Sequence, residues 1–263
     1  MILRRRTYTF GMKRLIWVFG VSLMAQTVSL EKERALGAHM AAEIRKVSPP
    51  FPVPEVVAYV ERMGARLAAF VPSGSFRFEV VGAGRAAPMG LPGGVVFVPA
   101  TFLLMAEDEA EVAAMMAHAM GHVALRHGFV SLRATKEGAI PLLFMGGWMG
   151  SHASAEERTA LIPAGFLGSV RSNELEADRF GAELAGKAGY DAAALARYVQ
   201  RVQPEDWNEH VALPPKGERL GALAGVAGAG GEVSNSEFLR VREMVRVMLG
   251  VPAGRKAPSL AGR

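Results

Sequence analysis

Apolar residues recur every three or four positions along most of this chain, which is the spacing of helices that bury one side. Pro or Gly usually stands where the pattern is interrupted. The stretches that we predict to be helical are 29–47, 55–70, 108–127, 172–188, 191–202, 216–224 and 236–249. Residues 76–80 alternate with period two and residues 95–98 are apolar throughout, so each predicts a short strand. Between these strands, residues 82–90 are rich in Gly and Ala and predict a loop.

The first 28 residues have the organisation of a secretory signal. A basic stretch ends at Lys13-Arg14, and the apolar run 15–25 follows it. Cleavage after this run and retention as an N-terminal anchor both fit the pattern, and Met12 would give a more ordinary signal if it were the true start. A buried N-terminal helix is a third, less favoured interpretation. We expect an exported protein that is periplasmic or anchored in the membrane facing the periplasm.

The net charge of +5 comes from this N-terminal segment, because five of the 30 basic residues lie in the first 25 positions and no acidic residue does. The remainder is formally neutral, which argues against a basic face that binds nucleic acid. The chain has no cysteines. Their absence excludes disulfides, thiolate metal sites and lipid attachment at a cysteine.

The residues most indicative of chemistry are His118 and His122. They lie four positions apart in the predicted helix 108–127, so both imidazoles project from one side. Two neutral imidazoles at that spacing can share a Zn²⁺ ion. The usual motif is His-Glu-x-x-His, in which the Glu is the general base, but here its position holds Ala119. Taken alone, the pair fits two hydrogen-bonded core histidines equally well.

A tight zinc site needs a third protein ligand, and the predicted helix 172–188 offers one. Glu174 and Asp178 are four positions apart on that helix and share a face. One carboxylate can close the metal site, while the other hydrogen-bonds the far nitrogen of a ligand histidine and fixes its tautomer. With both carboxylates considered, we favour a zinc site over a pair of core histidines.

Several separated blocks of residues 30–225 occur in the order of a known family. The blocks are 91–98, the helix with His118, His122, His127 and Gly128, then Arg171, Glu174 with Asp178, Gly181, and 188–191. They resemble the HtpX/BepA-type zinc metallopeptidases, a gluzincin family that includes the prenyl-protein (CAAX) proteases. The resemblance implies an α+β, zincin-like fold, mostly helical, with a small sheet over the active-site helix. It also implies that His118, His122 and Glu174 bind Zn²⁺, that Asp178 supports a ligand, and that polypeptides are the substrates or clients.

The resemblance divides the chain into three predicted parts. Residues 1–28 form the signal peptide or anchor, which would allow membrane association, and residues 29–225 form the metallopeptidase-like domain. Residues 226–263 comprise a Gly-rich linker, a terminal helix and a tail that we expect to be disordered. The apolar run 140–149 is too short to span a bilayer, so packing beneath a loop is its preferred interpretation.

The sequence departs from the family pattern where chemistry takes place. Ala119 replaces the catalytic Glu, residues 87–89 read Ala-Pro-Met where the family often has Asn-Ala-Phe, and Leu213 replaces a His that commonly precedes Pro. A positioned acid-base group contributes ~10²–10⁴-fold to a rate. We therefore expect peptide hydrolysis to be abolished or strongly reduced. The alternative is a non-catalytic zinc protein that binds polypeptides as a chaperone or adaptor. The additional departures favour a natural loss of the Glu over an engineered one.

Other residues near the motif receive structural interpretations. His127 lies five positions after His122 and should leave the metal face, so we expect a cation near the helix C-terminus. The methionines at 115, 116 and 120 are expected to fill the core. His210 is expected to be an exposed loop residue.

Overall fold

The structure is a computed structural model that describes residues 29–72, 75–82, 87–128, 164–205, 212–226 and 230–252. Four predictions lie outside these residues: the signal at 1–28, the apolar run 140–149, the position of His210 and the tail after Pro252. Among the helices of the described part, none combines the length and the apolar character that crossing a bilayer requires.

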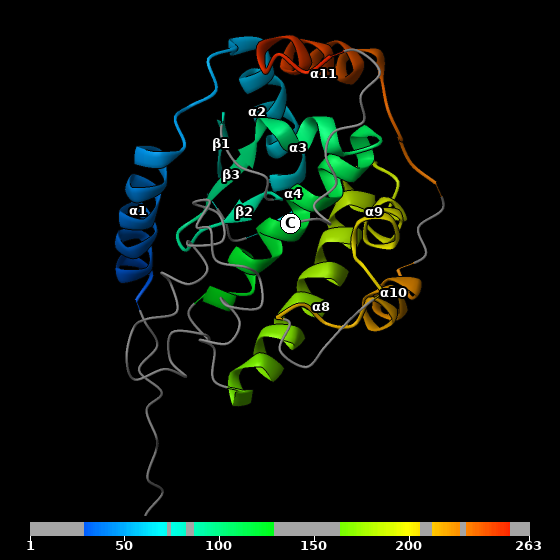
Figure 1. Cartoon of the computed structure of the whole chain (residues 1–263). Helices are drawn as coiled ribbons and strands as arrows, with labels where there is room; N and C mark the ends of the chain where they lie inside the picture. The colour runs from blue at the N-terminus through cyan, green and yellow to red at the C-terminus, as the bar shows by residue number, and fades with distance from the viewer. Residues whose placement is uncertain are drawn as a thin grey trace, which may run out of the picture.

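Helices surround a small sheet in the described ranges (Figure 1). The helices are α1 (Leu30–Val47), α2 (Pro54–Ala68), α3 (Ala100–Met105), α4 (Glu109–Ala124), α8 (Ala164–Lys187), α9 (Ala194–Val202), α10 (Lys216–Ala224) and α11 (Ser236–Met248). The strands are β1 (Arg77–Val81), β2 (Met89–Gly90) and β3 (Val95–Pro99). The predicted α+β class, mostly helical with a small sheet, is confirmed.

The sheet has the order β1-β3-β2, with β1 parallel and β2 antiparallel to the central strand. All five residues of β3 are buried, which explains why its sequence is apolar throughout rather than alternating. The sequence predicted β1 and β3 but assigned residues 82–90 to a loop. That assignment is wrong for β2, where Met89 pairs with Phe97 and Gly90 with Val96.

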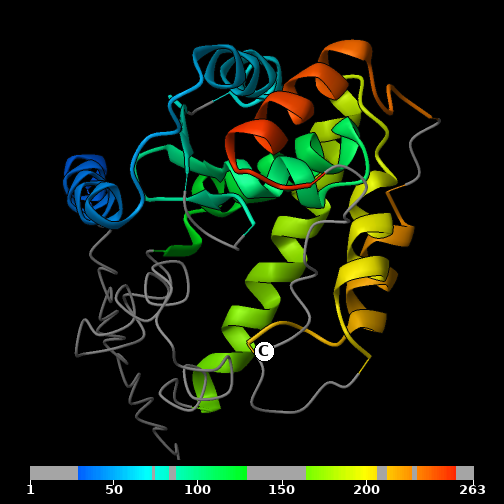
Figure 2. The ribbon, with the colours of Figure 1, turned by 45° about the horizontal axis from the view of Figure 1, so that its top comes forward.

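Helix α4 is the centre of the molecule. It contacts the sheet on one side and α8 on the other, as Figures 1 and 2 show. Every residue from Glu109 to Gly121 is buried. We expected an amphipathic helix here, and that expectation is wrong: a helix covered on all sides is apolar all round except where its polar groups have partners.

Small residues allow α4 and α8 to approach each other closely beside His118. A Cβ atom added to Gly181 would lie 2.7 Å from the backbone nitrogen of His118, and one added to Gly121 would lie 3.3 Å from the Cα atom of Ala177. A larger side chain at Gly181 would therefore push α8 away from the histidines.

Three helix ends differ from the predicted ones by three residues or more. Helix α8 begins at Ala164, well before residue 172, and α9 begins at Ala194 rather than 191. Helix α4 ends at Ala124 rather than at 127, because Arg126 turns the chain with a φ of 58°. That left-handed conformation costs a non-glycine residue roughly 1–2 kcal/mol. A double contact stabilises it: Nε and Nη2 of Arg126 lie 2.9 and 2.7 Å from Oε2 of the buried Glu33.

Two peripheral helices are attached at the ends of the described chain. Helix α1 packs Met40, Ala41 and Ile44 onto the sheet, and its Gly37 lies so close to Pro92 that a Cβ would be 1.6 Å from the carbonyl oxygen. Helix α11 crosses the molecule beside α2 and α3 (Figure 1) and buries Phe238, Val241 and Val245 in the main core.

Candidate metal centre

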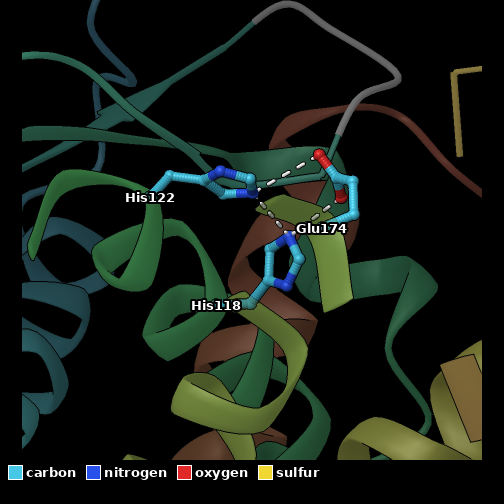
Figure 3. A group of neighbouring side chains, drawn as sticks. All are labelled: His118, His122 and Glu174. Carbon is cyan, nitrogen blue, oxygen red and sulfur yellow. Dashed lines mark hydrogen bonds and ion pairs between the residues drawn. The ribbon is translucent and has the colours of Figure 1, made fainter. Parts of the chain in front are cut away.

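The first half of the site is built by the N-terminal cap of α4 and the helical period. Asp108 Oδ1 accepts a 2.8 Å hydrogen bond from the backbone nitrogen of Glu111, which fixes where the helix begins. Ten and fourteen residues after Asp108, His118 and His122 project from one side. Their Nε2 atoms are 3.1 Å apart, as the spacing predicted (Figure 3).

The second half comes from α8. Glu174 points between the two rings, with Oε2 at 3.5 Å from Nε2 of His118 and Oε1 at 3.5 Å from Nε2 of His122 (Figure 3). One ligand atom from each of the three residues lies within 4.8 Å of the others. The structure thus brings together the three residues that the sequence nominated as ligands.

The separations fit a zinc ion. Zinc–ligand distances of about 2.0–2.2 Å in a tetrahedron place neighbouring ligand atoms roughly 3.3–3.5 Å apart. The two Nε2 atoms are 3.1 Å apart, and each lies 3.5 Å from a different oxygen of Glu174, so the carboxylate presents one oxygen to each ring. Two imidazole nitrogens and a carboxylate also form a donor set that zinc prefers. Three protein ligands leave one position open, which is the arrangement of catalytic rather than structural zinc sites.

A buried network of ion pairs and hydrogen bonds surrounds His118. Its Nδ1 is 3.0 Å from Oδ1 of Asp178, which is fully buried. Arg219 donates from Nε and Nη2 to the two oxygens of Asp178, each at 2.7 Å. Arg219 also donates to Gln203, and Gln203 donates to the carbonyl of Pro214. In the neutral form of His118, a proton on the Nδ1 that faces Asp178 leaves the lone pair of Nε2 directed toward Glu174 and His122, which is the role expected of a supporting carboxylate.

Sequence reasoning did not identify Arg219. The pattern of residues 216–224 predicts a short helix but not which residue of it is buried. The available signal was Asp178 itself. A carboxylate with no solvent exposure requires a cation, and Arg can donate to both oxygens at once.

The interpretation of His127 as a cation near a helix end is wrong. Its ring is buried, and its Nδ1 is 3.1 Å from Nδ1 of His122. Because α4 ends at Ala124 and Arg126 turns the chain, the following ring returns to the metal face rather than continuing around the helix. Burial lowers the pKa of His127, so it is neutral at pH 7. Its Nε2 lies 3.5 Å from Oε2 of Glu176.

In the metal-free site, His118 is the histidine that carries a second ring proton at pH 7. Burial opposes the charge on this ring, but hydrogen bonds to Asp178 and Glu174 raise its pKa to about 9. Burial lowers the pKa of His122 to about 4. Burial opposes ionisation of Glu174 as well, yet the neighbouring histidines lower its pKa to about 2. Asp178, paired with Arg219 and His118, also has a lowered pKa and is ionised.

The opposite side of α4 is lined by small residues. Ala119 is buried, and its carbonyl oxygen lies so close to Gly90 that a Cβ there would approach to 2.2 Å. A small cavity of about 30 Å³ lies beside the next turn of α4. It is lined by Glu33, Gly90, Pro92, His122, Val123, Arg126 and Gly128. Of the other departures from the family pattern, Met89 lies in β2 and Leu213 precedes α10 with 38% of its surface exposed.

Two histidines of one helix that meet a carboxylate of another form an arrangement typical of zinc peptidases. Residues 54–227 match the model of peptidase family M48, and this match covers more than half of the chain. The chain therefore belongs to peptidase family M48, whose members are zinc-dependent.

Similarity to individual proteins points in the same direction. The chain is 26% identical over 211 residues to the beta-barrel assembly-enhancing protease of Yersinia pestis, covering 72% of this chain and 41% of that one. It is 24% identical over 203 residues to the Escherichia coli K12 protein of that name, with coverages of 72% and 41%. A Vibrio cholerae serotype O1 protein, provisionally named as such a protease, is 29% identical over 195 residues, with coverages of 70% and 40%. The chain thus spans about two-fifths of the length of these relatives.

Proposed function

We propose that this protein is an exported zinc-binding member of the family that engages polypeptides and whose peptide hydrolysis is abolished or strongly reduced. The convergence of His118, His122 and Glu174 carries the zinc part of the proposal. Ala119, directly after the first ligand, carries the catalytic part.

The zinc ion would supply Lewis-acid chemistry, polarising a scissile carbonyl and making a water more acidic. The protein's own share is to remove a proton from that water and deliver it to the leaving amine. In the family pattern the Glu after the first His does this, and Ala119 has no group that can hold a proton. We therefore infer that this chain retains the ligands and lacks the base.

The carboxylates that the described residues place around the histidines are engaged elsewhere. Glu174 faces both ligand rings, Asp178 is bound by His118 and Arg219, and Glu176 contacts His127. Glu33 lines the cavity beside His122 but accepts two contacts from Arg126. This supports the inference that no neighbour replaces the missing Glu.

The partner and the location rest on relatedness and on the N-terminal sequence. Membership of a peptidase family favours a polypeptide as the bound molecule. The names of the relatives, which refer to beta-barrel assembly, together with a signal-like segment at 1–28, favour the cell envelope as the place of action. We infer a role in protein quality control there.

The test compares casein cleavage by zinc-loaded protein with cleavage by an Ala119→Glu variant. We expect the variant to gain at least ~10²–10⁴-fold, the contribution of a positioned acid-base group. Ala119→Gln is the matched control, because it adds the same volume without a base. The double variant with His118→Ala should lose the gain.

Two results would contradict this proposal. Cleavage by the parent that disappears in His118→Ala would show that hydrolysis does not need a Glu at 119. A parent that binds no zinc would remove the metal site itself. A parent that holds casein without cutting it, while Ala119→Glu cuts, would favour the chaperone or adaptor form of the proposal.

A further inference from the structure

The two ligand histidines are held in different ways. The ring nitrogen of His118 that faces away from the ligand group meets the carboxylate of Asp178 directly. The corresponding nitrogen of His122 meets a third imidazole: Nδ1 of His122 and Nδ1 of His127 are 3.1 Å apart. The two ring planes are nearly perpendicular, at 77°, with their centroids 5.1 Å apart.

Hydrogen-bond chemistry fixes the direction of this contact once Nε2 of His122 is a metal ligand. A ligand nitrogen carries no proton, so the proton of the neutral His122 ring is on Nδ1. That N–H must then donate to Nδ1 of His127, which accepts only if its own proton is on Nε2. Nε2 of His127 in turn lies 3.5 Å from Oε2 of Glu176, whose side chain is 52% exposed. This last contact is an ion-pair distance, and among the described residues the proton on Nε2 of His127 has no hydrogen-bond acceptor.

The backbone that places His127 is an unusual one. Arg126 must adopt a left-handed conformation, and it is held there by contacts to the buried Glu33 of α1. Without that turn, a residue five positions after His122 would lie about 140° away around the helix. A strained residue and a half-buried ion pair therefore both serve to return this ring to His122.

We propose that His127 is the positioning residue of His122: a neutral imidazole, protonated on Nε2, that accepts the Nδ1 proton of His122 and so directs Nε2 toward the metal. The inference rests on the zinc site proposed above and assigns a role that the ligand set alone does not contain. His127 touches neither metal nor substrate in this role. It sets the tautomer and the ring orientation of a residue that does.

The experiment measures zinc affinity by competition with a chromophoric chelator in the parent, His127→Ala and His127→Asn. Removing such a partner typically weakens metal binding ~10–100-fold, which is the loss expected for His127→Ala. The amide oxygen of His127→Asn can stand near the position of Nδ1, so this variant should stay within a few-fold of the parent. Glu176→Gln, one step further out and half exposed, should also change affinity little.

A second measurement does not depend on any variant folding. In zinc-loaded parent protein labelled with ¹⁵N-histidine, the ring nitrogen shifts report which nitrogens carry protons. We expect Nδ1 protonated on His122 and unprotonated on His127. The reverse assignment on His127 would overturn the proposal, as would His127→Ala with parental zinc affinity or His127→Asn as weak as His127→Ala.

The controls separate this inference from the zinc site itself. A parent that binds one zinc, lost in His118→Ala but unchanged in His127→Ala, would refute only the role of His127. A parent that binds no zinc would overturn both. Thermal unfolding of the metal-free proteins, compared in parallel, shows whether His127→Ala acts on affinity rather than on stability of the fold.

Discussion

The two sides of helix α4 differ in which functional residues of the family pattern they retain. The side that faces α8 carries both histidines, with Asp178 of α8 3.0 Å from His118 and bound in turn by Arg219 of α10. The side that faces β2 carries Ala119 against Gly90, with no ionisable group at either position. Metal holding and proton transfer are thus separable, because the hydrogen bonds that position the ligands do not pass through residue 119.

The largest effect is expected from a change on the side of α4 that faces α8. Glu174→Ala removes one of three ligands, so we expect zinc affinity to fall by more than the ~10–100-fold that follows loss of an outer partner. Metal content after dialysis and the dissociation constant measure this. Glu176→Ala, two residues along the same helix, is the control and should retain one zinc. Equal zinc in both variants would refute Glu174 as a ligand.

The next largest effect should come from Arg219→Leu. It leaves the ionised Asp178 buried without its Arg, with only the protonated His118 beside it, and breaking such a pair costs roughly 3–5 kcal/mol of unfolding free energy. Urea unfolding of the metal-free protein measures the change. Arg240→Leu removes an exposed ion pair to Glu237 and should cost at most ~1 kcal/mol. A similarly small cost for Arg219→Leu would show that the network does not stabilise the fold.

On the side of α4 that faces β2, Gly90→Ala tests how closely the strand packs against the helix. Its Cβ would meet the carbonyl oxygen of Ala119 at 2.2 Å, and relieving such overpacking typically costs ~1–3 kcal/mol. The same urea experiment measures this cost. Gly217→Ala is the control, because no atom lies within 4 Å of the added Cβ and Ala suits a helix. If neither change lowers the free energy of unfolding, β2 does not pack against α4 as closely as described.

The smallest effect concerns pH. The pKa of His118 is raised to about 9 in the metal-free protein, so at pH 7 this ring carries a proton that a metal ion must displace. His122 and Glu174, with pKa values near 4 and 2, need release none. Zinc affinity should therefore rise about tenfold per pH unit between pH 6 and 8, and flatten near 9. Calorimetry in buffers of different ionisation enthalpy counts the proton; zero protons released at pH 7 would contradict the assignment.

Local signals predicted much of the helical framework. Ser29 and Asp108, the first residues of two predicted helical stretches, cap α1 and α4, because a cap depends on residues within one turn. Helical spacing likewise predicted that His118 shares a face with His122, and Glu174 with Asp178. The sequence did not predict how α4 and α8 pack together. Gly181 allows the two helices to approach each other closely beside His118.

The missed features all depend on distant partners. Strand β2 is two residues long and exists because β3 pairs with it. Arg219 is defined by a carboxylate 41 positions earlier in the chain. The position of His127 depends on the left-handed turn at Arg126, which a contact with Glu33 stabilises from 93 positions away. No periodicity within a single segment contains these relations.

The contact between Glu33 and Arg126 also joins the first described helix to the turn that follows α4. Glu33 lies in the first turn of α1, and Arg126 lies four residues after His122. A change in the first turn of α1 would therefore act on the turn that brings His127 beside His122, although 93 positions of sequence separate the two segments.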